Sequence, residues 1–284
     1  MYNLLMQGNI LKGMTGLKLS MWSSYYMDLS PEDAIVELQK YGYGYMELSD
    51  EHSVVLMQRG DLKETGKTFA AFAREHHVQI SQGHLLLRTR ITTPEGLAGI
   101  KKQLDLFRAI GISRAVLHCD SMSDESQEEK QCCNLKALRE LTDYIRDTDM
   151  VLCLENLGCK SFTQSAEDLL FFIRQLGDDH LGICLDTGHL NLTKCQSQRE
   201  FILAAGKHLK ALHLADNEGA VDQHMMPFGR GKVDFTEVFD TLHKIGYNGL
   251  YNYELPGERK APLAIRGYKL EYIAKMTRYL YGSV

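Results

Sequence analysis

The sequence predicts a single α/β domain, a (β/α)8 TIM barrel, over residues 1–284. Three observations predict this fold. Eight short apolar runs of strand length alternate along the chain with amphipathic segments of helical length. Several helical segments end on a glycine just before the next apolar run, as a helix C-terminus often does. No GxGxxG or GxxxxGK[ST] motif follows an early strand, which argues against the competing doubly wound open sheet.

The predicted strands share a run of mainly apolar residues that ends on, or just before, a polar one. They are Leu17–Ser20, Gly44–Leu48, Val78–Gln82, Ala115–His118, Val151–Glu155, Leu181–Asp186, Leu209–Leu214 and Gly249–Glu254. The glycines that close helices between them are Gly42, Gly111, Gly177 and Gly246. This strand–helix alternation is the pattern that a closed parallel barrel requires.

Helix starts carry the signals of capped N-termini. Ser30-Pro-Glu-Asp33 combines an N-cap, a first-turn proline and an acidic residue three positions on. Thr93-Pro-Glu95 and Ser165-Ala-Glu-Asp168 resemble it. The remaining helical segments are predicted near Leu62–His76, Gln131–Arg146, Ser197–His208, Phe235–Ile245 and Leu263–Tyr279.

The composition is that of an ordinary soluble protein, 44% hydrophobic and 24% charged. A net charge of −5 and a pI near 6.1 argue against nucleic acid as a partner. The seven cysteines lack zinc-finger or CxxC spacing, which indicates reduced thiols in a cytoplasmic protein. No apolar stretch is long enough to cross a bilayer, and the first residues are too polar for a signal peptide, so no membrane association is expected.

Acidic and imidazole side chains stand at the ends of four consecutive predicted strands. They are Glu155, Asp186, His213 and Glu254. Two earlier strands lead to His84 and His118. Because the carboxyl ends of barrel strands open on one mouth, these side chains should converge there. A carboxylate buried after an apolar run is costly unless it is paired or bound to a cation. The first four residues therefore predict a divalent-metal site, whose oxygen-rich ligation suits manganese, magnesium or cobalt and also admits zinc.

Further ligand pairs lie in the loops after two of these strands. Asp186-Thr-Gly-His189 places an aspartate and a histidine around a tight turn. Asp222-Gln-His224 offers a second pair in the long loop after the seventh strand, and Asp216 adds a carboxylate near the rim. We expect these side chains to reach the same mouth.

Six segments together resemble the xylose-isomerase-like superfamily of sugar isomerases and epimerases, which also contains the apurinic endonuclease IV proteins. They are Leu154-Glu-Asn156, Leu185-Asp-Thr-Gly-His189, Leu212-His-Leu-Ala-Asp216, Asp222-Gln-His224, Gly229-Arg-Gly-Lys-Val-Asp-Phe235 and Tyr253-Glu254. The resemblance implies that one catalytic metal is held by Glu155, Asp186, His213 and Glu254. In the endonuclease branch, His84 and His118 would share Glu155 to hold a second metal. His189, Asp222 and His224 would hold a third.

The leading hypothesis is metal-dependent isomerisation or epimerisation of a ketose or ketose phosphate through a metal-stabilised enediolate. Glu155 and Glu254 would flank the substrate, one removing a proton and the other returning it. His189 and His224 would then bind hydroxyl groups. A dehydratase acting on a keto-sugar or keto-inositol needs the same chemistry and remains an alternative. So does an endonuclease IV-like abasic-site nuclease, although the acidic charge and the absence of basic, aromatic-rich loops argue against it. A barrel that only binds a ligand should have lost ligand positions, and this chain keeps them.

Three further residues are candidate substrate contacts. Glu47 ends the second strand, Trp22 follows the first and can stack on a sugar face, and Arg230 lies in a loop at the mouth. Arg230, with Arg88, Arg90 and Lys232, is a candidate for binding a phosphate. The expected partner is thus a small sugar or sugar phosphate. The sequence leaves open whether the barrel forms a homo-oligomer through its outer helices.

Overall fold

Eight parallel strands form a barrel in the computed structural model, which describes residues 16–121 and 124–282. The strands are β1 (Leu19–Trp22), β2 (Tyr45–Leu48), β3 (Gln79–His84), β4 (Arg114–Leu117), β5 (Val151–Glu155), β6 (Leu181–Asp186), β7 (Leu209–His213) and β8 (Tyr251–Tyr253). Their order in the sheet is β7-β6-β5-β4-β3-β2-β1-β8. A parallel bridge between Leu214 and Tyr253 joins the two ends of this order. The predicted barrel is therefore confirmed.

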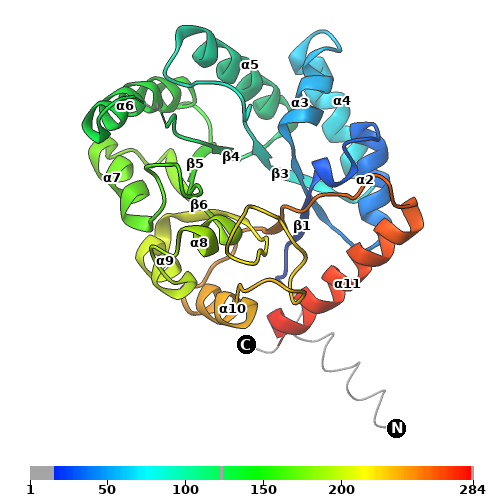
Figure 1. The fold of residues 1–284 in the computed structure, drawn as a ribbon. Helices are drawn as coiled ribbons and strands as arrows, with labels where there is room; N and C mark the ends of the chain where they lie inside the picture. The colour runs from blue at the N-terminus through cyan, green and yellow to red at the C-terminus, as the bar shows by residue number, and fades with distance from the viewer. Residues whose placement is uncertain (1–15, 122–123, 283–284) are drawn as a thin grey trace.

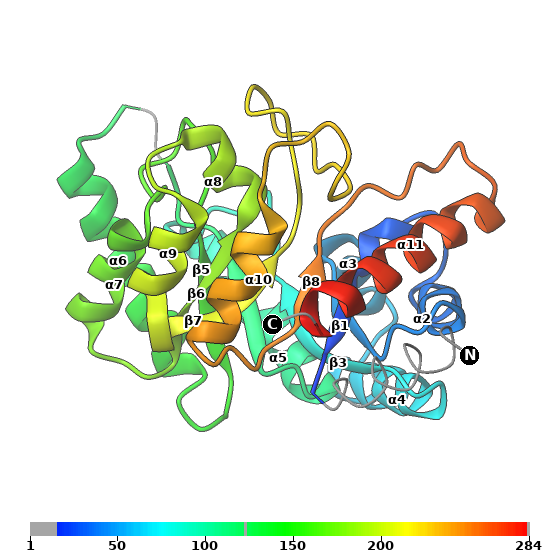
Figure 2. The same cartoon turned by 90° about the horizontal axis from the view of Figure 1, so that it is seen from below.

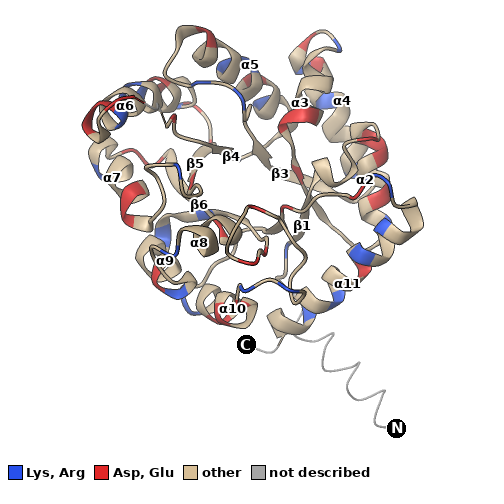
Figure 3. Ribbon diagram, in the orientation of Figure 1, with Lys and Arg blue, Asp and Glu red and all other residues tan. Residues whose placement is uncertain are grey.

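Helices surround the strands as a ring when the molecule is seen along the barrel (Figure 1). They are α2 (Pro31–Lys40), α3 (Asp50–Met57), α4 (Leu62–Glu75), α5 (Pro94–Ile110), α6 (Gln127–Tyr144), α7 (Ala166–Leu176), α8 (Thr187–Thr193), α9 (Gln198–Ala205), α10 (Phe235–Lys244) and α11 (Leu263–Gly282). Two 3-10 turns, η1 (Ser23–Tyr26) and η2 (Gly206–His208), complete the elements of the described residues. Both signs of charge are spread over these outer helices (Figure 3). No helix in the described part is long and apolar enough to span a membrane.

The predicted caps form. The Ser30 hydroxyl accepts the Asp33 N–H at 3.0 Å, and Ser165 forms a reciprocal capping box with Asp168. Gly111 and Gly177 end α5 and α7 in the left-handed region, with φ of 95° and 58°, where a side chain would be strained.

Several elements differ from the prediction. The first strand runs to Trp22, because Trp22 still pairs with Glu47 of β2. Helix α6 begins at Gln127, earlier than expected, because Ser126 caps it. Two short helices, α3 and α8, were not predicted. The second of them starts directly after β6, because the Asp186 side chain accepts the His189 N–H at 2.6 Å as an N-cap.

Side-chain alternation along the strands separates two layers of core. Leu152 and Leu154 of β5 belong to the large core between barrel and helices. Cys153 belongs instead to a small buried cluster inside the barrel, with residues of the neighbouring strands β4, β6 and β7. Glu155 lies two residues after Cys153, so its carboxylate points into the barrel above this cluster.

The mouth of the barrel is partly covered by the long segment 214–234 between β7 and α10. Figure 2 shows this segment at the same end of the molecule as α8. Asp216 and Met225 exchange two backbone hydrogen bonds, at 3.0 and 2.7 Å, which fold the segment back on itself. The carboxyl ends of the strands therefore open beneath a structured loop.

Candidate active site

Four strand ends bring the predicted metal ligands together at the barrel mouth. They are Glu155 on β5, Asp186 on β6, His213 on β7 and Glu254 directly after β8. One ligand atom from each lies within 4.8 Å of all the others, and all four side chains are buried. Asp186 and His213 lie on the two central strands of this group, and the glutamates lie on either side. Metal binding by this cluster stays a prediction, and its geometry suits one cation.

Two atoms in this cluster test whether a cation fits. His213 Nδ1 lies 3.2 Å from Glu155 Oε1 and 3.3 Å from Glu254 Oε2, but neither contact has the geometry of a hydrogen bond. Within residues 16–121 and 124–282, Asp186 Oδ2 is also buried without a hydrogen-bond partner. A buried polar atom left unpaired costs about 1–3 kcal/mol. A divalent ion would supply the missing partner to both atoms, so the residues fit a metal.

A buried network of hydrogen bonds orients the His213 ring. Its Nε2 donates to Glu47 Oε1 at 3.0 Å, and the other oxygen of Glu47 accepts from Asn252. Ser20 in turn donates to Asn252 Oδ1 at 2.7 Å. With its proton on Nε2, the imidazole presents the Nδ1 lone pair to the cluster, as a metal ligand must.

The ionisation of these side chains follows from the excess of carboxylates. Burial alone lowers the pKa of His213, yet the surrounding acidic groups, Glu47 and Glu254 among them, raise it well above its usual value. Burial opposes ionisation of Glu155, yet the His213 and His118 imidazoles hold its pKa well below the ordinary range. The cluster therefore needs positive charge, which protons supply when a metal does not.

His84 and His118 contact the opposite side of Glu155. Their Nε2 atoms lie 3.3 and 3.0 Å from Glu155 Oε2. His84 Nδ1 also lies 2.7 Å from the Leu85 carbonyl, so Nδ1 carries the proton of a neutral ring and Nε2 would face the carboxylate as a lone pair. Because that lone pair and the carboxylate oxygen repel each other, either a second proton on the His84 ring or a cation between the two groups is required. Despite the cost of burial, Glu155 raises the pKa of His84 to about 9.

His189, Asp222 and His224 form a third group at the rim. The Nε2 atoms of the two imidazoles lie 3.3 and 3.1 Å from Asp222 Oδ2. Each ring turns Nδ1 toward a backbone carbonyl, of Asn156 at 3.0 Å and of Glu254 at 2.8 Å. His224 adopts a φ of 44°, a conformation that costs free energy in a residue other than glycine. The strain lies in segment 214–234, which carries Asp222 and His224, whereas His189 lies on α8.

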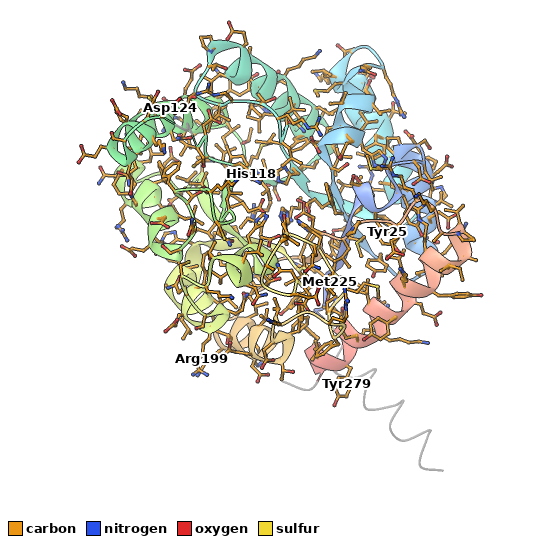
Figure 4. The ribbon with its side chains drawn as sticks, in the orientation of Figure 1. Tyr25, His118, Asp124, Arg199, Met225 and Tyr279 are labelled. Atoms are coloured by element: carbon orange, nitrogen blue, oxygen red, sulfur yellow. The ribbon has the colours of Figure 1, made fainter. Side chains whose placement is uncertain are left out.

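The predicted substrate contacts are placed differently from one another. Glu47, which was expected to contact substrate, has no exposed surface. Its two oxygens accept hydrogen bonds from His213 and Asn252, so Glu47 orients His213. Trp22 is half-buried at the end of β1, and its indole N–H has no hydrogen-bond partner in the described part of the chain. The Arg230 side chain is 78% exposed and lies 3.5 Å from Glu218. Figure 4 shows His118 inside the ring of helices.

Two supporting residues were not recognised from the sequence. Asn156 is fully buried and ties β5 to β6 by accepting the Asp186 N–H at 2.7 Å and donating to the Asp186 carbonyl at 3.0 Å. Asp216, expected as a rim carboxylate, accepts the backbone N–H groups of Asn217 and Val233 at 2.8 and 2.9 Å. It fixes the loop. The only sequence signal for these supporting roles was that Asn156 and Asp216 lie within the motifs that carry the metal-ligand candidates.

The fold and the site together define a (β/α)8 barrel with a carboxylate–imidazole centre at its mouth. The chain belongs to the xylose isomerase-like TIM barrel family, whose sequence model matches residues 35–276.

Several relatives and structures are similar to this chain. L-ribulose-5-phosphate 3-epimerase UlaE of Salmonella paratyphi A is 27% identical over 165 residues, which are 58% of this chain and 57% of that protein. An uncharacterized protein of Methanocaldococcus jannaschii is 30% identical over 133 residues, 45% of this chain and 44% of its own length. The chain thus spans about half the length of these relatives.

Solved structures support the fold. D-psicose 3-epimerase of Clostridium cellulolyticum H10, with D-tagatose, superposes with a TM-score of 0.79 at 16% identity, covering 93% of this chain and 99% of that one. The 3-keto-D-glucoside 4-epimerase YcjR of E. coli gives 0.76 at 18% identity, covering 91% and 99%. At these identities the likeness concerns the fold alone.

Proposed function

We propose that the protein catalyses the metal-dependent epimerisation or isomerisation of a ketose or ketose phosphate. The observation that carries the proposal is the buried cluster of Glu155, Asp186, His213 and Glu254, with two acceptor atoms that lack partners. Membership of the xylose isomerase-like family supports it, and so does the relative that is named as an epimerase.

A divalent cation held by these four ligands would polarise a substrate carbonyl and acidify the adjacent carbon-bound proton. Glu155 and Glu254 approach the centre from different sides, since β6 and β7 lie between their strands. One carboxylate would accept the proton from carbon. The other would return it to the opposite face in an epimerase, or to the neighbouring carbon in an isomerase.

The remaining polar groups of the mouth would hold the substrate. The imidazoles of His189 and His224 lie beside Asp222 at the rim and would bind hydroxyl groups. Arg88 and Arg90 line a cavity of about 350 Å³ that also includes His84 and His118. A phosphate on the far end of a ketose would fit there, because guanidinium groups bind phosphate oxygens in pairs.

Deuterium uptake from solvent water into a panel of ketoses and ketose phosphates tests the proposal. Wild-type protein with manganese should exchange the proton next to the carbonyl, and Glu155→Gln and Glu254→Gln should each abolish formation of the epimer or isomer while the protein stays folded. Glu218→Gln is the matched control, because Glu218 lies on the same rim and contacts Gln223 and Arg230. Formation of the epimer or isomer in either of the first two variants excludes the two-glutamate mechanism, because one glutamate alone can only exchange the proton on its own face. Product analysis by NMR separates an isomer or epimer from a dehydrated product.

One observation favours a second candidate, cleavage of DNA at abasic sites. His84 and His118 with Glu155, and His189 and His224 with Asp186, form further groups of ligand atoms within 4.8 Å. Three neighbouring cations would suit phosphodiester hydrolysis. The metal-loaded protein should leave an abasic duplex intact under conditions where it exchanges sugar protons. Efficient nicking would favour the nuclease.

A further inference from the structure

A cavity of about 460 Å³ lies among the amino ends of the strands, where four cationic side chains meet. They are Lys18, Arg114, Lys207 and Lys210. This is the end of the barrel away from α8 and segment 214–234 (Figure 2). The other lining residues include serines, tyrosines, glutamines and an asparagine, and the lining within the described residues contains no aspartate or glutamate. In a chain with a net charge of −5, such a one-sided cluster calls for an explanation.

These cations have no anionic partner in the described part of the chain. No ion pair found there includes any of the four. Lys18 donates to the Asn248 carbonyl at 2.8 Å, and Arg114 donates to the Ser113 carbonyl at 2.7 Å. Residues 1–15, outside the described part, contain no aspartate or glutamate side chain that would neutralise them. Like charges around one cavity repel, and a bound anion offsets that repulsion.

A buried acceptor at the inner wall of the cavity adds an independent requirement. Gln82 of β3 is fully buried and lines the cavity. Its Nε2 donates to the Leu212 carbonyl at 3.4 Å, but its Oε1 lacks a hydrogen-bond partner among the residues that the structure describes. This oxygen calls for a donor, such as a ligand hydroxyl.

We propose that this cavity binds a small phosphorylated molecule that also carries a hydroxyl group. Lysine and arginine side chains recognise phosphate oxygens, and Gln82 Oε1 would accept from the hydroxyl. The volume lies within the range of small-molecule sites. The site is distinct from the metal-ligand cluster, and the inference does not depend on the proposed activity. Because Gln82 contacts the carbonyl of Leu212, next to His213, a ligand here also touches the strands that carry the catalytic mouth.

Calorimetric titration of glycerol 3-phosphate into chelator-treated, desalted protein tests the proposal. Metal removal prevents phosphate from binding to an ion at the opposite mouth. We expect saturable binding at one site, weakened at least about tenfold in Lys210→Gln and in Arg114→Gln. Lys102→Gln removes an exposed charge on α5 and should leave the affinity unchanged. Inorganic phosphate should bind more weakly, since it offers no separate alcohol group to Gln82.

Several outcomes would overturn the assignment. One is the absence of saturable binding at millimolar glycerol 3-phosphate. Equal weakening by Lys102→Gln would mean that net charge alone attracts the anion. Loss of binding in Arg88→Gln with retention in Lys210→Gln would place the phosphate at the catalytic mouth instead. If Arg114→Gln does not fold, Lys210→Gln carries the test, because Lys210 is only half-buried.

Discussion

Replacing Glu47 by glutamine should weaken metal binding although Glu47 lies outside the ligand set. The His213 N–H donates to Glu47 at 3.0 Å in a site where neither side chain is exposed. The carboxylate keeps the proton on Nε2 and leaves Nδ1 free to bind a metal. A glutamine has nearly the same shape, but it carries no charge, and its amide group would meet the Asn252 donor that now contacts Glu47.

The expected cost follows from these contacts. A hydrogen bond to a charged group is about twice as strong as a neutral one, and second-layer partners of metal-binding histidines typically contribute 10- to 100-fold in affinity. This corresponds to about 1.4–2.7 kcal/mol. We therefore expect the dissociation constant for manganese or zinc to rise by a factor of about 10 to 100.

Competition titration against a fluorescent chelator measures this change, and circular dichroism verifies that the variant is folded. The control is Glu51→Gln, which removes a nearby carboxylate that accepts from Ser24 at 3.0 Å. Saturating metal should restore most of the turnover of Glu47→Gln, because Glu47 is fully buried and both its oxygens are hydrogen-bonded to protein groups. A folded Glu47→Gln variant with wild-type metal affinity would refute the role assigned to Glu47.

Four further predictions concern the metal content of the protein, the Arg266–Asp28 pair and Gly231. Purified protein should carry a transition metal or bind manganese, and elemental analysis with titration that detects none would contradict the site. Arg266→Ala should lower the free energy of unfolding in urea by about 3 kcal/mol, because the buried guanidinium bonds both oxygens of Asp28 at 2.9 Å and stacks 4.5 Å from the Tyr26 ring. The hydrogen bonds from Arg266 lower the pKa of Asp28 below 3.8. The pair therefore stabilises the fold above pH 3.8, and this contribution is lost as the pH falls further. The free energy of unfolding should therefore fall more steeply with acid in the wild type than in Asp28→Asn, and identical curves would contradict this. Gly231→Ala would place a methyl group about 2 Å from the Asp216 carboxylate. It should lower the free energy of unfolding by about 1–3 kcal/mol in a denaturation experiment, and it should reduce the amount of bound metal. Unchanged stability would show that the loop adapts.

The strand ends explain why much of the site was predictable. Glu155, Asp186 and His213 each end an apolar run, and the barrel closes parallel strands so that such ends meet. Helix α8 was not predicted, because Asp186 acts both as the end of β6 and as an N-cap. A single residue with two local roles leaves the boundary between strand and helix ambiguous in sequence.

Glu47 shows where sequence reasoning reached its limit. Its place at the end of β2 suggested a substrate contact, but the barrel register sets it beside Trp22 and Gln82 and beneath His213, which lies 166 residues away. Asp216 was expected near the rim of the barrel, and Arg230 was expected in a loop at the mouth. The structure exposes Arg230 and buries Asp216 under the backbone of its own loop.

The sequence by itself determined the alternation of strands and helices, the capped helix starts and the set of acidic and imidazole residues at one end of the barrel. These features depend on local periodicity and on a general property of parallel barrels. Only the tertiary structure decided which carboxylates face a common centre and which support a neighbouring side chain. It also decided which lysines and arginines from distant segments surround the cavity at the amino ends of the strands. Those distinctions depend on strand register and on depth within the barrel, which arise from contacts between residues far apart in the chain.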